Sequence, residues 1–293
     1  MTALQYRSAF RADLFAGQAV IVTGGGSGIG RCTAHELASL GAGVAIVGRK
    51  IEKLQTVKAE IEGLTSAKVS IHVCDIRDEP GVKQMVADVL ARHGRIDGLV
   101  NNAGGQYPQP ARDITLKGWE TVVRNNLTGG FLVAREVYTQ WMEAHGGAIV
   151  NMIADIWHGM PTMAHSGAAR AGMLSFTESA ACEWGQAGVR VNAVAPGFIA
   201  SSGFDSYAPE MQEKLRGLTK TSPLQRHGTE AEVSSAIVYL LSEAAAYITG
   251  SYIRIDGGVP NARPMWKLEP SRSKPYEGFP LASTPQALMP DRD

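Results

Sequence analysis

The sequence lacks several features that mark specialised classes of protein. No run approaches the roughly 18 consecutive apolar residues of a membrane span, and the start MTALQYRSAFRADLF shows no apolar segment with a cleavage site. Lys and Arg number 28, as do Asp and Glu, so the basic excess that neutralises nucleic-acid phosphates is absent. The last residues, 289–293, are not a peroxisomal SKL-type signal. We therefore expect no membrane and no nucleic acid as partner, and the cytoplasm of a prokaryote as the location.

Cysteine is also scarce. Cys32, Cys74 and Cys182 are widely spaced, and the sequence contains no CxxC pair and no Cys/His cluster with metal-ligand spacing. Because small polarizable cysteines are commonly buried, we expect all three to be reduced core residues, and we expect no metal site.

Apolar material is plentiful, at 44% hydrophobic against 19% charged residues, which suits a packed globular domain. From Ala19 onward, short apolar runs alternate with longer segments of helical period; the runs are AVIVT, GVAIVG, KVSIHVC and GLVNN. Runs that are apolar on both faces are typical of parallel strands covered by helices on both sides. The repeated strand–helix order predicts a doubly wound α/β fold of the Rossmann type.

Helical period is clearest in two later segments. The apolar positions spaced by three and four are Val82, Met85, Val86, Val89 and Leu90, and then Val233, Ala236, Ile237, Leu240 and Leu241. After Gly258 the pattern ends, because seven of the fourteen prolines follow it and no helix tolerates that spacing.

These patterns divide the chain into an N-terminal extension (1–16), one dinucleotide-binding domain (17–258) and an extended C-terminal tail (259–293). The tail is either disordered or lies along a neighbouring surface, with Trp266, Tyr276 and Phe279 as candidate anchors.

A glycine-rich turn stands between the first apolar run and its helix. It reads Thr23-Gly24-Gly25-Gly26-Ser27-Gly28-Ile29-Gly30. Glycines let the backbone approach a pyrophosphate, and the helix that starts there presents its N–H groups to the anion. The sequence contains no GxxxxGK[ST] motif for a nucleoside triphosphate, so a dinucleotide is the expected ligand of Gly24, Ser27, Gly28, Ile29 and Gly30.

With this turn, residues 17–258 resemble the short-chain dehydrogenase/reductases. The motifs that carry the resemblance are TGGGSGIG, Asp75 in HVCDI, Asn101-Asn102-Ala103-Gly104, Asn126-Leu127-Thr128-Gly129, Asn192 to Gly197, Ile248-Thr249-Gly250 and Asp256-Gly257-Gly258. The resemblance implies that Asp75 and Ile76 bind the adenine edge and that Asn102, Ala103 and Gly104 line the cofactor. It also implies that Pro196, Gly197 and Ile199 flank the nicotinamide carboxamide.

The end of the second apolar run indicates which cofactor is bound. A carboxylate there would accept hydrogen bonds from the ribose 2′-hydroxyl of NAD, but the sequence reads Gly48-Arg49-Lys50. Arg49 and Lys50 supply positive charge for a 2′-phosphate, so we expect NADP(H) in preference to NAD(H). The alternative is that both residues simply begin a solvated helix face.

The catalytic set departs from the common family pattern of Ser, Tyr, Lys and Asn. The tyrosine position is Ser166, the lysine position is Arg170, and the serine position falls within 152–154, where no residue has a hydroxyl. Asn126 is intact, and the polar side chain nearest to the missing serine is Asp155.

This loss indicates a different reaction. A serine cannot imitate a phenol of lowered pKa that exchanges a proton with a carbonyl or alcohol oxygen. Adding hydride to the β-carbon of an α,β-unsaturated thioester needs only hydrogen-bond donors for the thioester oxygen. The run Ala164-His165-Ser166-Gly167-Ala168-Ala169-Arg170-Ala171-Gly172 resembles the enoyl-CoA and dienoyl-CoA reductases of the family, and the peroxisomal trans-2-enoyl-CoA reductases in particular.

This resemblance implies an NADPH-dependent reductase of an enoyl thioester. In it, Arg170 holds the nicotinamide ribose, while Ser166 and Asn126 support the thioester oxygen directly or through water. The proton donor stays open between Asp155, His158, Tyr107 and bulk water, and Asp155 has the alternative role of a turn cap.

Two other functions remain open. One is a dehydrogenase of an unsaturated terpenoid or aliphatic alcohol in which His165, Asp155 or Tyr107 replaces the phenol. The other is a cofactor-binding protein without catalysis. We expect the stretch from Ile199 to Pro223, with Tyr207, Met211 and Leu215 on an amphipathic helix, to cover a small-molecule substrate. The family resemblance implies a homotetramer built on the helices after Lys117 and around Arg170.

Overall fold

The computed structural model describes residues 5–201, 204, 209–262, 267–282, 284–285 and 288, and the structural statements below concern these residues. Tyr207, Trp266 and residues 289–293, which were named above, lie outside the described residues, as does the side chain of Met211.

A parallel sheet of seven strands forms the centre of the molecule, in the order β3-β2-β1-β4-β5-β6-β9. The strands are β1 (Ala19–Thr23), β2 (Gly43–Gly48), β3 (Val69–Val73), β4 (Gly98–Asn101), β5 (Gly147–Met152), β6 (Val189–Pro196) and β9 (Tyr252–Ile255). A separate parallel pair is formed by β7 (Ile199–Ala200) and β8 (Gly228–Thr229). The order reverses between β1 and β4, so their carboxyl ends open a crevice where such sheets bind dinucleotides. The predicted doubly wound fold is confirmed.

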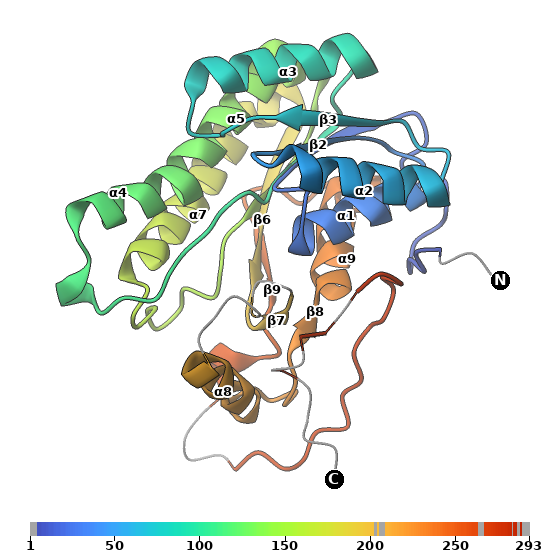
Figure 1. The fold of residues 1–293 in the computed structure, drawn as a ribbon. Coiled ribbons are helices and arrows are strands. Elements are labelled where there is room, and N and C mark those ends of the chain that lie inside the picture. Colours follow the sequence, from blue (N-terminus) through green and yellow to red (C-terminus); the bar gives the residue numbers. More distant parts are fainter. Residues whose placement is uncertain are drawn as a thin grey trace.

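Helices cover both faces of this sheet (Figure 1). One face carries α1 (Gly28–Ser39), α2 (Ile51–Leu64) and α9 (Glu230–Leu241), and the other carries α3 (Glu79–His93), α5 (Gly129–Val137) and α7 (Ala164–Trp184). The remaining helices are α4 (Leu116–Val123), α6 (Glu143–His145) and α8 (Pro209–Leu218). Both segments with predicted helical period, α3 and α9, are helices, and α8 lies within the predicted substrate-covering stretch.

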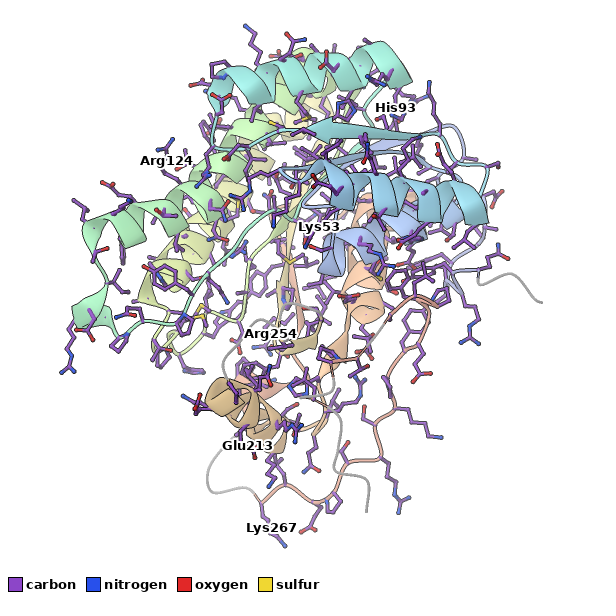
Figure 2. The ribbon with its side chains drawn as sticks, in the orientation of Figure 1. Lys53, His93, Arg124, Glu213, Arg254 and Lys267 are labelled. Carbon is purple, nitrogen blue, oxygen red and sulfur yellow. The ribbon has the colours of Figure 1, made fainter. Side chains whose placement is uncertain are left out.

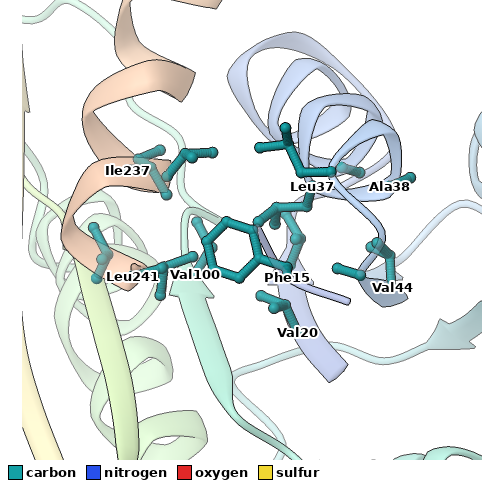
Figure 3. Packing of buried hydrophobic residues seen from close by; sticks show 14 of the residues in the cluster. Phe15, Val20, Leu37, Ala38, Val44, Val100, Ile237 and Leu241 are labelled. Atoms are coloured by element: carbon teal, nitrogen blue, oxygen red, sulfur yellow. The ribbon is translucent and has the colours of Figure 1, made fainter. Parts of the chain in front are cut away.

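The core under α1 and α9 shows why the apolar runs form buried strands. Leu37 of α1, Ile237 of α9 and Val100 of β4 pack around the ring of Phe15, as Figure 3 shows. Phe15 is only 1% exposed, and its backbone N–H bonds the carbonyl of Leu40 at 2.9 Å. Close packing of this kind covers both faces of the sheet, whose carboxyl ends carry the site.

Local signals fix where the helices begin and end. At the start of α9, the Thr229 hydroxyl accepts the Glu232 N–H at 3.2 Å, while the Glu232 carboxylate accepts the Thr229 N–H at 2.9 Å. This reciprocal pair is a capping box. Helix α3 ends at Gly94, whose φ of +77° lies in the left-handed region that favours glycine.

The tail residues 267–282 are extended and lie along the domain near the N-terminal segment (Figure 1). Phe279 is 4% exposed, and it packs with Tyr6 and with Cys32 of α1. The Tyr276 carbonyl accepts the Thr229 hydroxyl at 2.9 Å. Of the two outcomes left open for the tail, the described part thus takes the surface-bound one, with Tyr276 and Phe279 as anchors.

The prediction for the cysteines is wrong at one position. Cys32 and Cys74 are buried, but Cys182 is exposed. Residues 181 and 184 of α7 face the core. The helical period turns residue 182, which lies between them in the sequence, toward the solvent. Among the described helices, none has the combination of length and apolar character that crossing a membrane requires.

Candidate active site

The glycine-rich turn lies between β1 and α1, at the crevice. Gly24 and Gly28 have φ values of +68° and +57°, which side-chain-bearing residues rarely adopt. A Cβ on Gly24 would lie 2.7 Å from Nδ2 of Asn102. Within the described chain, the Ser27 side chain does not cap α1. The first N–H groups of α1 thus remain available to an anion.

A cavity of about 210 Å³ continues from this turn along the ends of β2 and β3. Of the predicted cofactor residues, Gly24, Ser27, Arg49, Lys50, Asp75, Ile76, Ala103 and Gly104 line it together. Lys53 of α2, which the sequence analysis did not single out, lines it as well (Figure 2). In the part of the chain that the structure describes, Arg49, Lys50 and Lys53 form no ion pair, so a positive edge borders the cavity.

Asp75 is held by its neighbour at this edge. The Arg77 guanidinium donates to both carboxylate oxygens of Asp75, at 2.9 and 2.5 Å. Hydrogen bonds from Arg77 lower the pKa of Asp75 to about 2, against the opposing effect of burial. Asp75 is therefore a carboxylate at neutral pH, with its charge balanced by Arg77.

The ends of β1 and β4 are bonded to each other. The hydroxyl of Thr23 accepts the backbone N–H groups of Asn102 and Ala103, each at 3.0 Å. The Asn102 amide donates to the Thr23 carbonyl at 2.9 Å. Asn102 thus fixes the shape of the turn.

Arg170 and Asn126 meet at Gly104. A Cβ on Gly104 would lie 2.6 Å from Oδ1 of Asn126 and 2.7 Å from Nη2 of Arg170. Arg170 is 9% exposed and donates to the Met152 carbonyl at 2.5 Å, while its Nε is buried without a partner in the described chain. Burial lowers the pKa of Arg170 to about 10, so it remains a cation at neutral pH.

Asn126 lies in a wider helical turn between α4 and α5 and clamps the loop after β4. Its amide nitrogen donates to the carbonyls of Gly105 at 2.7 Å and Val122 at 2.9 Å. Its carbonyl oxygen accepts the Gly105 N–H at 3.1 Å. Both amide protons of Asn126 are therefore already bonded within the protein.

Ser166 lies in the first turn of α7, fully buried, and its hydroxyl donates to Oε1 of Gln106 at 2.5 Å. Beside it, Nδ1 of His165 accepts the Ser166 N–H at 2.9 Å. Sequence reasoning missed Gln106 as a site residue. Its only signal was its position two residues after the motif Asn101-Asn102-Ala103-Gly104, where nothing distinguishes a site residue from a loop residue.

Tyr107 packs its ring edge-on against His165, with 4.8 Å between the ring centres. Its hydroxyl lies against Gly118 of α4, where a side chain would collide with it. Tyr107 therefore uses its phenol for packing between the loop and α4.

Asp155 belongs to a different group of residues. Its N–H donates to the Pro196 carbonyl at 3.3 Å, beside Gly197, and its carboxylate accepts the N–H of Trp157 as a turn cap would. Burial and the charge of Asp256 raise the pKa of Asp155. Its Oδ1 is buried, with no partner in the described chain.

The other end of the crevice is formed by β6 and β7. Pro196 ends β6 and Ile199 begins β7, and the Gly197 N–H donates to the Ile255 carbonyl at 2.9 Å. Arg254 of β9 carries its guanidinium over the Trp157 ring at 5.5 Å, close to this end (Figure 2). In the described chain no hydrogen bond joins Asp155 to Ser166, so the predicted catalytic residues fall into two groups. Ser166, Asn126 and Arg170 form one, and Asp155 belongs to the other.

These residues fit a nicotinamide dinucleotide. The turn has close-packed glycines and uncapped N–H groups at the start of α1, which suit a pyrophosphate. The cavity beside the turn is lined by the carboxylate of Asp75 and by the cations Arg49, Lys50 and Lys53. Arg170, whose Nε has no partner in the described chain, lies at Gly104, another residue of the lining. Among the described residues, no group of His, Cys, Asp and Glu could hold a metal ion.

A family model described as Enoyl-(Acyl carrier protein) reductase matches residues 24–260. The solved structure of a citronellol catabolism dehydrogenase of Pseudomonas aeruginosa is 58% identical, with a TM-score of 0.78, over 87% of this chain and 100% of that chain. A probable 2,4-dienoyl-CoA reductase of Bacillus subtilis is 36% identical over 82% of this chain and 96% of its own length. A glucose 1-dehydrogenase of Gluconobacter oxydans is also 36% identical, over 84% of this chain and 93% of its own length. Relatives at equal identity thus have names that specify different substrates.

Proposed function

The chain belongs to the short-chain dehydrogenase/reductase family, and we propose that this oxidoreductase uses NADPH to reduce the C=C bond of an α,β-unsaturated acyl thioester. That it binds a nicotinamide cofactor follows from the family. The choice of NADPH and of the thioester is the proposal.

The observation that carries the proposal is the buried hydroxyl of Ser166 where ordinary members of the family have a phenol. A serine hydroxyl titrates far above neutral pH and cannot exchange a proton with a carbonyl or alcohol oxygen. Arg170, in place of a lysine, stays charged at neutral pH and is a poor proton relay. The site is therefore suited to a reaction that stabilises negative charge on oxygen and delivers its proton elsewhere.

When bound, NADPH would supply a hydride to the β-carbon, the electron pair of the double bond would move to the thioester oxygen, and one proton would add to the α-carbon. The protein contributes binding and placement. The turn of Gly24 to Gly30 holds the pyrophosphate, Arg170 holds the nicotinamide ribose, and the loop clamped by Asn126 borders the acyl group.

Asp155 is the strongest candidate for holding the proton. Its raised pKa favours a protonated carboxyl, and it lies beside Pro196 and Gly197 at the nicotinamide end. Tyr107 is a weaker candidate because its hydroxyl lies against Gly118. Asp155→Asn should lower kcat steeply and Tyr107→Phe only slightly. Equal small effects would leave His158 and water as the remaining sources of the proton.

The preference for NADPH rests on charge. Gly48 ends β2 without a carboxylate, and Arg49, Lys50 and Lys53 border the cavity beside it. These cations can form charge-assisted hydrogen bonds with the 2′-phosphate of NADPH. The 2′-hydroxyl of NADH would have no carboxylate at Gly48 to accept its hydrogen bond.

The proposal is tested with purified protein by following NADPH absorbance. The substrates are crotonyl-CoA, a longer trans-2-enoyl-CoA and a 2,4-dienoyl-CoA, and the same assay is run with citronellal and, in the oxidative direction, with citronellol and NADP⁺. Turnover of the thioesters alone supports the proposal. Brisk turnover of the alcohol or aldehyde, with none of the thioesters, refutes it.

A second candidate is a dehydrogenase of an unsaturated terpenoid alcohol, favoured by the name of the 58% identical relative. It requires a phenol substitute, and His165, Asp155 or Tyr107 would have to serve. The alcohol arm of the assay tests it. Tight NADPH binding without turnover of any substrate would instead indicate a cofactor-binding protein.

We further propose a homotetramer in the cytoplasm. Aromatic side chains extend along α7 and along α5 and the turn after it. Phe131 is 36% exposed, and its ring centre lies 5.6 Å from that of Phe176, while the stacked rings of Tyr138 and Trp184 have centres 4.3 Å apart. Light scattering of the purified protein measures the oligomer, and cell fractionation the location.

A further inference from the structure

We propose that the C-terminal tail belongs to the cofactor-binding machinery: it holds together the first turns of α1 and α9, which border the glycine-rich turn, and so keeps that turn in the shape that binds a dinucleotide. Docking of the tail and binding of the cofactor should therefore favour each other. The inference goes beyond the proposed function, because it concerns any nicotinamide dinucleotide and no particular substrate.

Two helix starts meet at the glycine-rich turn. Helix α1 begins within the turn, at Gly28, and α9 begins at Glu230. A Cβ on Gly28 would lie 3.8 Å from Oε1 of Glu230. Ser27 and Gly28 of the turn line one cavity of about 250 Å³ together with Arg31 of α1 and with Glu230. The position of the turn therefore depends on where the first turns of both helices lie.

The tail binds the start of α9 through both residues of its capping box. The Thr229 hydroxyl donates to the Tyr276 carbonyl at 2.9 Å, and the Glu232 carboxylate accepts the Tyr276 N–H at 3.1 Å. Arg226, which pairs with Glu232 at 2.7 Å, donates to a backbone carbonyl of the tail at 3.1 Å. Glu230 lies between the two residues of the box, so the tail fixes the backbone on both sides of it.

The same tail reaches the first turn of α1 through an aromatic ring. Phe279 is buried, and the guanidinium of Arg31 lies over its ring, 5.1 Å from the ring centre. His35, one turn farther along α1, packs on this ring with 5.2 Å between the centres. Arg31 also donates to both carboxylate oxygens of Glu60 in α2, at 2.8 and 2.9 Å. Because an aromatic face attracts a cation, Phe279 helps to hold Arg31 where α1 meets α2.

The N-terminal segment joins the tail to both helices. The Arg7 N–H donates to the Gly278 carbonyl of the tail at 2.9 Å. The Tyr6 hydroxyl donates to the buried carboxyl group of Glu36 in α1 at 3.1 Å, and Glu36 accepts the hydroxyl of Ser234 in α9 at 2.5 Å. The red tail and the blue N-terminal segment lie next to each other beside these helices in Figure 1. The contacts thus join the tail, the N-terminal segment, α1 and α9 in one group.

This arrangement couples the tail to the cofactor. A helix start binds an anion through N–H groups that point at it, so its position relative to the turn sets the affinity. Release of the tail removes the contacts that hold the two helix starts, and the released form therefore binds the pyrophosphate less tightly. Linkage requires the reverse as well: bound cofactor must stabilise the docked tail by the same factor, and such factors are typically about 5–150.

The first experiment measures cofactor affinity in the full-length chain by cofactor fluorescence. Phe279→Ala should weaken NADPH binding at least about fivefold, and NADH binding by the same factor, because both cofactors contain the pyrophosphate. Met142→Ala is the matched control, since it removes a buried side chain from the core on the other face of the sheet. It should leave both dissociation constants within about twofold. The temperature is one at which circular dichroism shows each variant folded, so lost stability alone changes neither constant.

The second experiment uses only the wild-type protein, so it decides the question even for a Phe279→Ala chain that does not fold. Trypsin cleavage after the exposed Arg272 reports release of the tail, and cleavage after Arg92, near the end of α3, reports opening of the domain. NADPH should slow cleavage after Arg272 by a factor that levels off once the cofactor is saturating, and this factor should equal the loss of affinity in Phe279→Ala. Protection of Arg92 should instead keep rising with the NADPH concentration.

Several outcomes overturn the inference. One is an NADPH affinity in Phe279→Ala that equals that of the wild type or of Met142→Ala. A loss confined to NADPH would place the effect at the 2′-phosphate and not at the turn. Cleavage after Arg272 that NADPH leaves unchanged, or that it slows without limit in parallel with Arg92, would show that the tail and the cofactor are not coupled. None of these outcomes touches the proposed function. Wild-type protein that reduces no thioester overturns the proposed function and leaves this inference standing.

Discussion

Glu230, the first residue of α9, is a buried carboxyl group whose ionisation should limit stability at neutral pH. It is 8% exposed and lines a cavity of about 250 Å³ beside the glycine-rich turn. Burial raises its pKa from 4.5 to about 7, although the charge of Arg31 acts in the opposite direction. Arg31 itself is bonded to both carboxylate oxygens of Glu60, at 2.8 and 2.9 Å, so it neutralises Glu230 only weakly.

The sign of the pH dependence follows from this upward shift. Below about pH 4.5 the carboxyl is protonated in both the folded and the unfolded chain, so it has no differential effect. Between about pH 4.5 and pH 7 the unfolded chain has lost the proton that the folded chain still holds, so stability falls across this interval and levels off above it. The full shift corresponds to about 3 kcal/mol, an upper limit because the N-terminus of α9 favours a negative charge.

Glu230→Gln removes this penalty, since a neutral amide replaces the carboxyl. The variant should match the wild type near about pH 4.5 and be more stable by up to about 3 kcal/mol near about pH 8. The measurement is urea denaturation at both pH values, with Glu213→Gln on the exposed surface of α8 as the control (Figure 2). If Glu230→Gln gives the same stability difference at both pH values, or destabilises the protein at high pH, the reasoning is wrong.

Three further predictions concern other parts of the molecule. Arg49→Asp should weaken NADPH binding at least tenfold while leaving NADH binding within about threefold, measured by cofactor fluorescence; equal losses would show that no 2′-phosphate is bound there. Gly104→Ala should lower kcat/KM at least a hundredfold without loss of fold by circular dichroism, because its Cβ would lie 2.6 Å from Asn126 and 2.7 Å from Arg170; near-normal activity would show that these side chains can move apart. Phe279→Ala should lower the free energy of unfolding by about 3 kcal/mol and expose the tail to limited proteolysis, whereas unchanged protection would mean that the tail is held without this ring.

The fold was the part of the molecule that the sequence predicted best. Apolar runs such as Val44–Val47 are buried on both faces, and that property is written in consecutive residues. The glycine-rich turn was equally readable, because strand, turn and helix are neighbours in the chain. Cys182 shows the limit of this reasoning, since its residue type suggested burial while its position on α7 faces outward.

The catalytic group was harder to predict, because its members come from distant segments. The sequence identified Arg170 and Asn126 by their motifs, but not that they meet at Gly104. It also placed Ser166 at the tyrosine position without showing that Gln106, sixty residues earlier, accepts a hydrogen bond from its hydroxyl.

The sequence by itself determined the sheet, the turn and the loss of the phenol, because each of these depends on residue type and local spacing. Only the tertiary structure decided which donors remain available to a substrate, because a hydrogen bond between a loop after β4 and the first turn of α7 leaves no periodic signal in either segment. It also brought Asp155 next to Asp256, two strand ends that the chain separates widely, and their proximity changes the chemistry of Asp155. Through-space contacts set the pKa values and the hydrogen-bonding capacity of the site, and the packing of the sheet fixes those contacts.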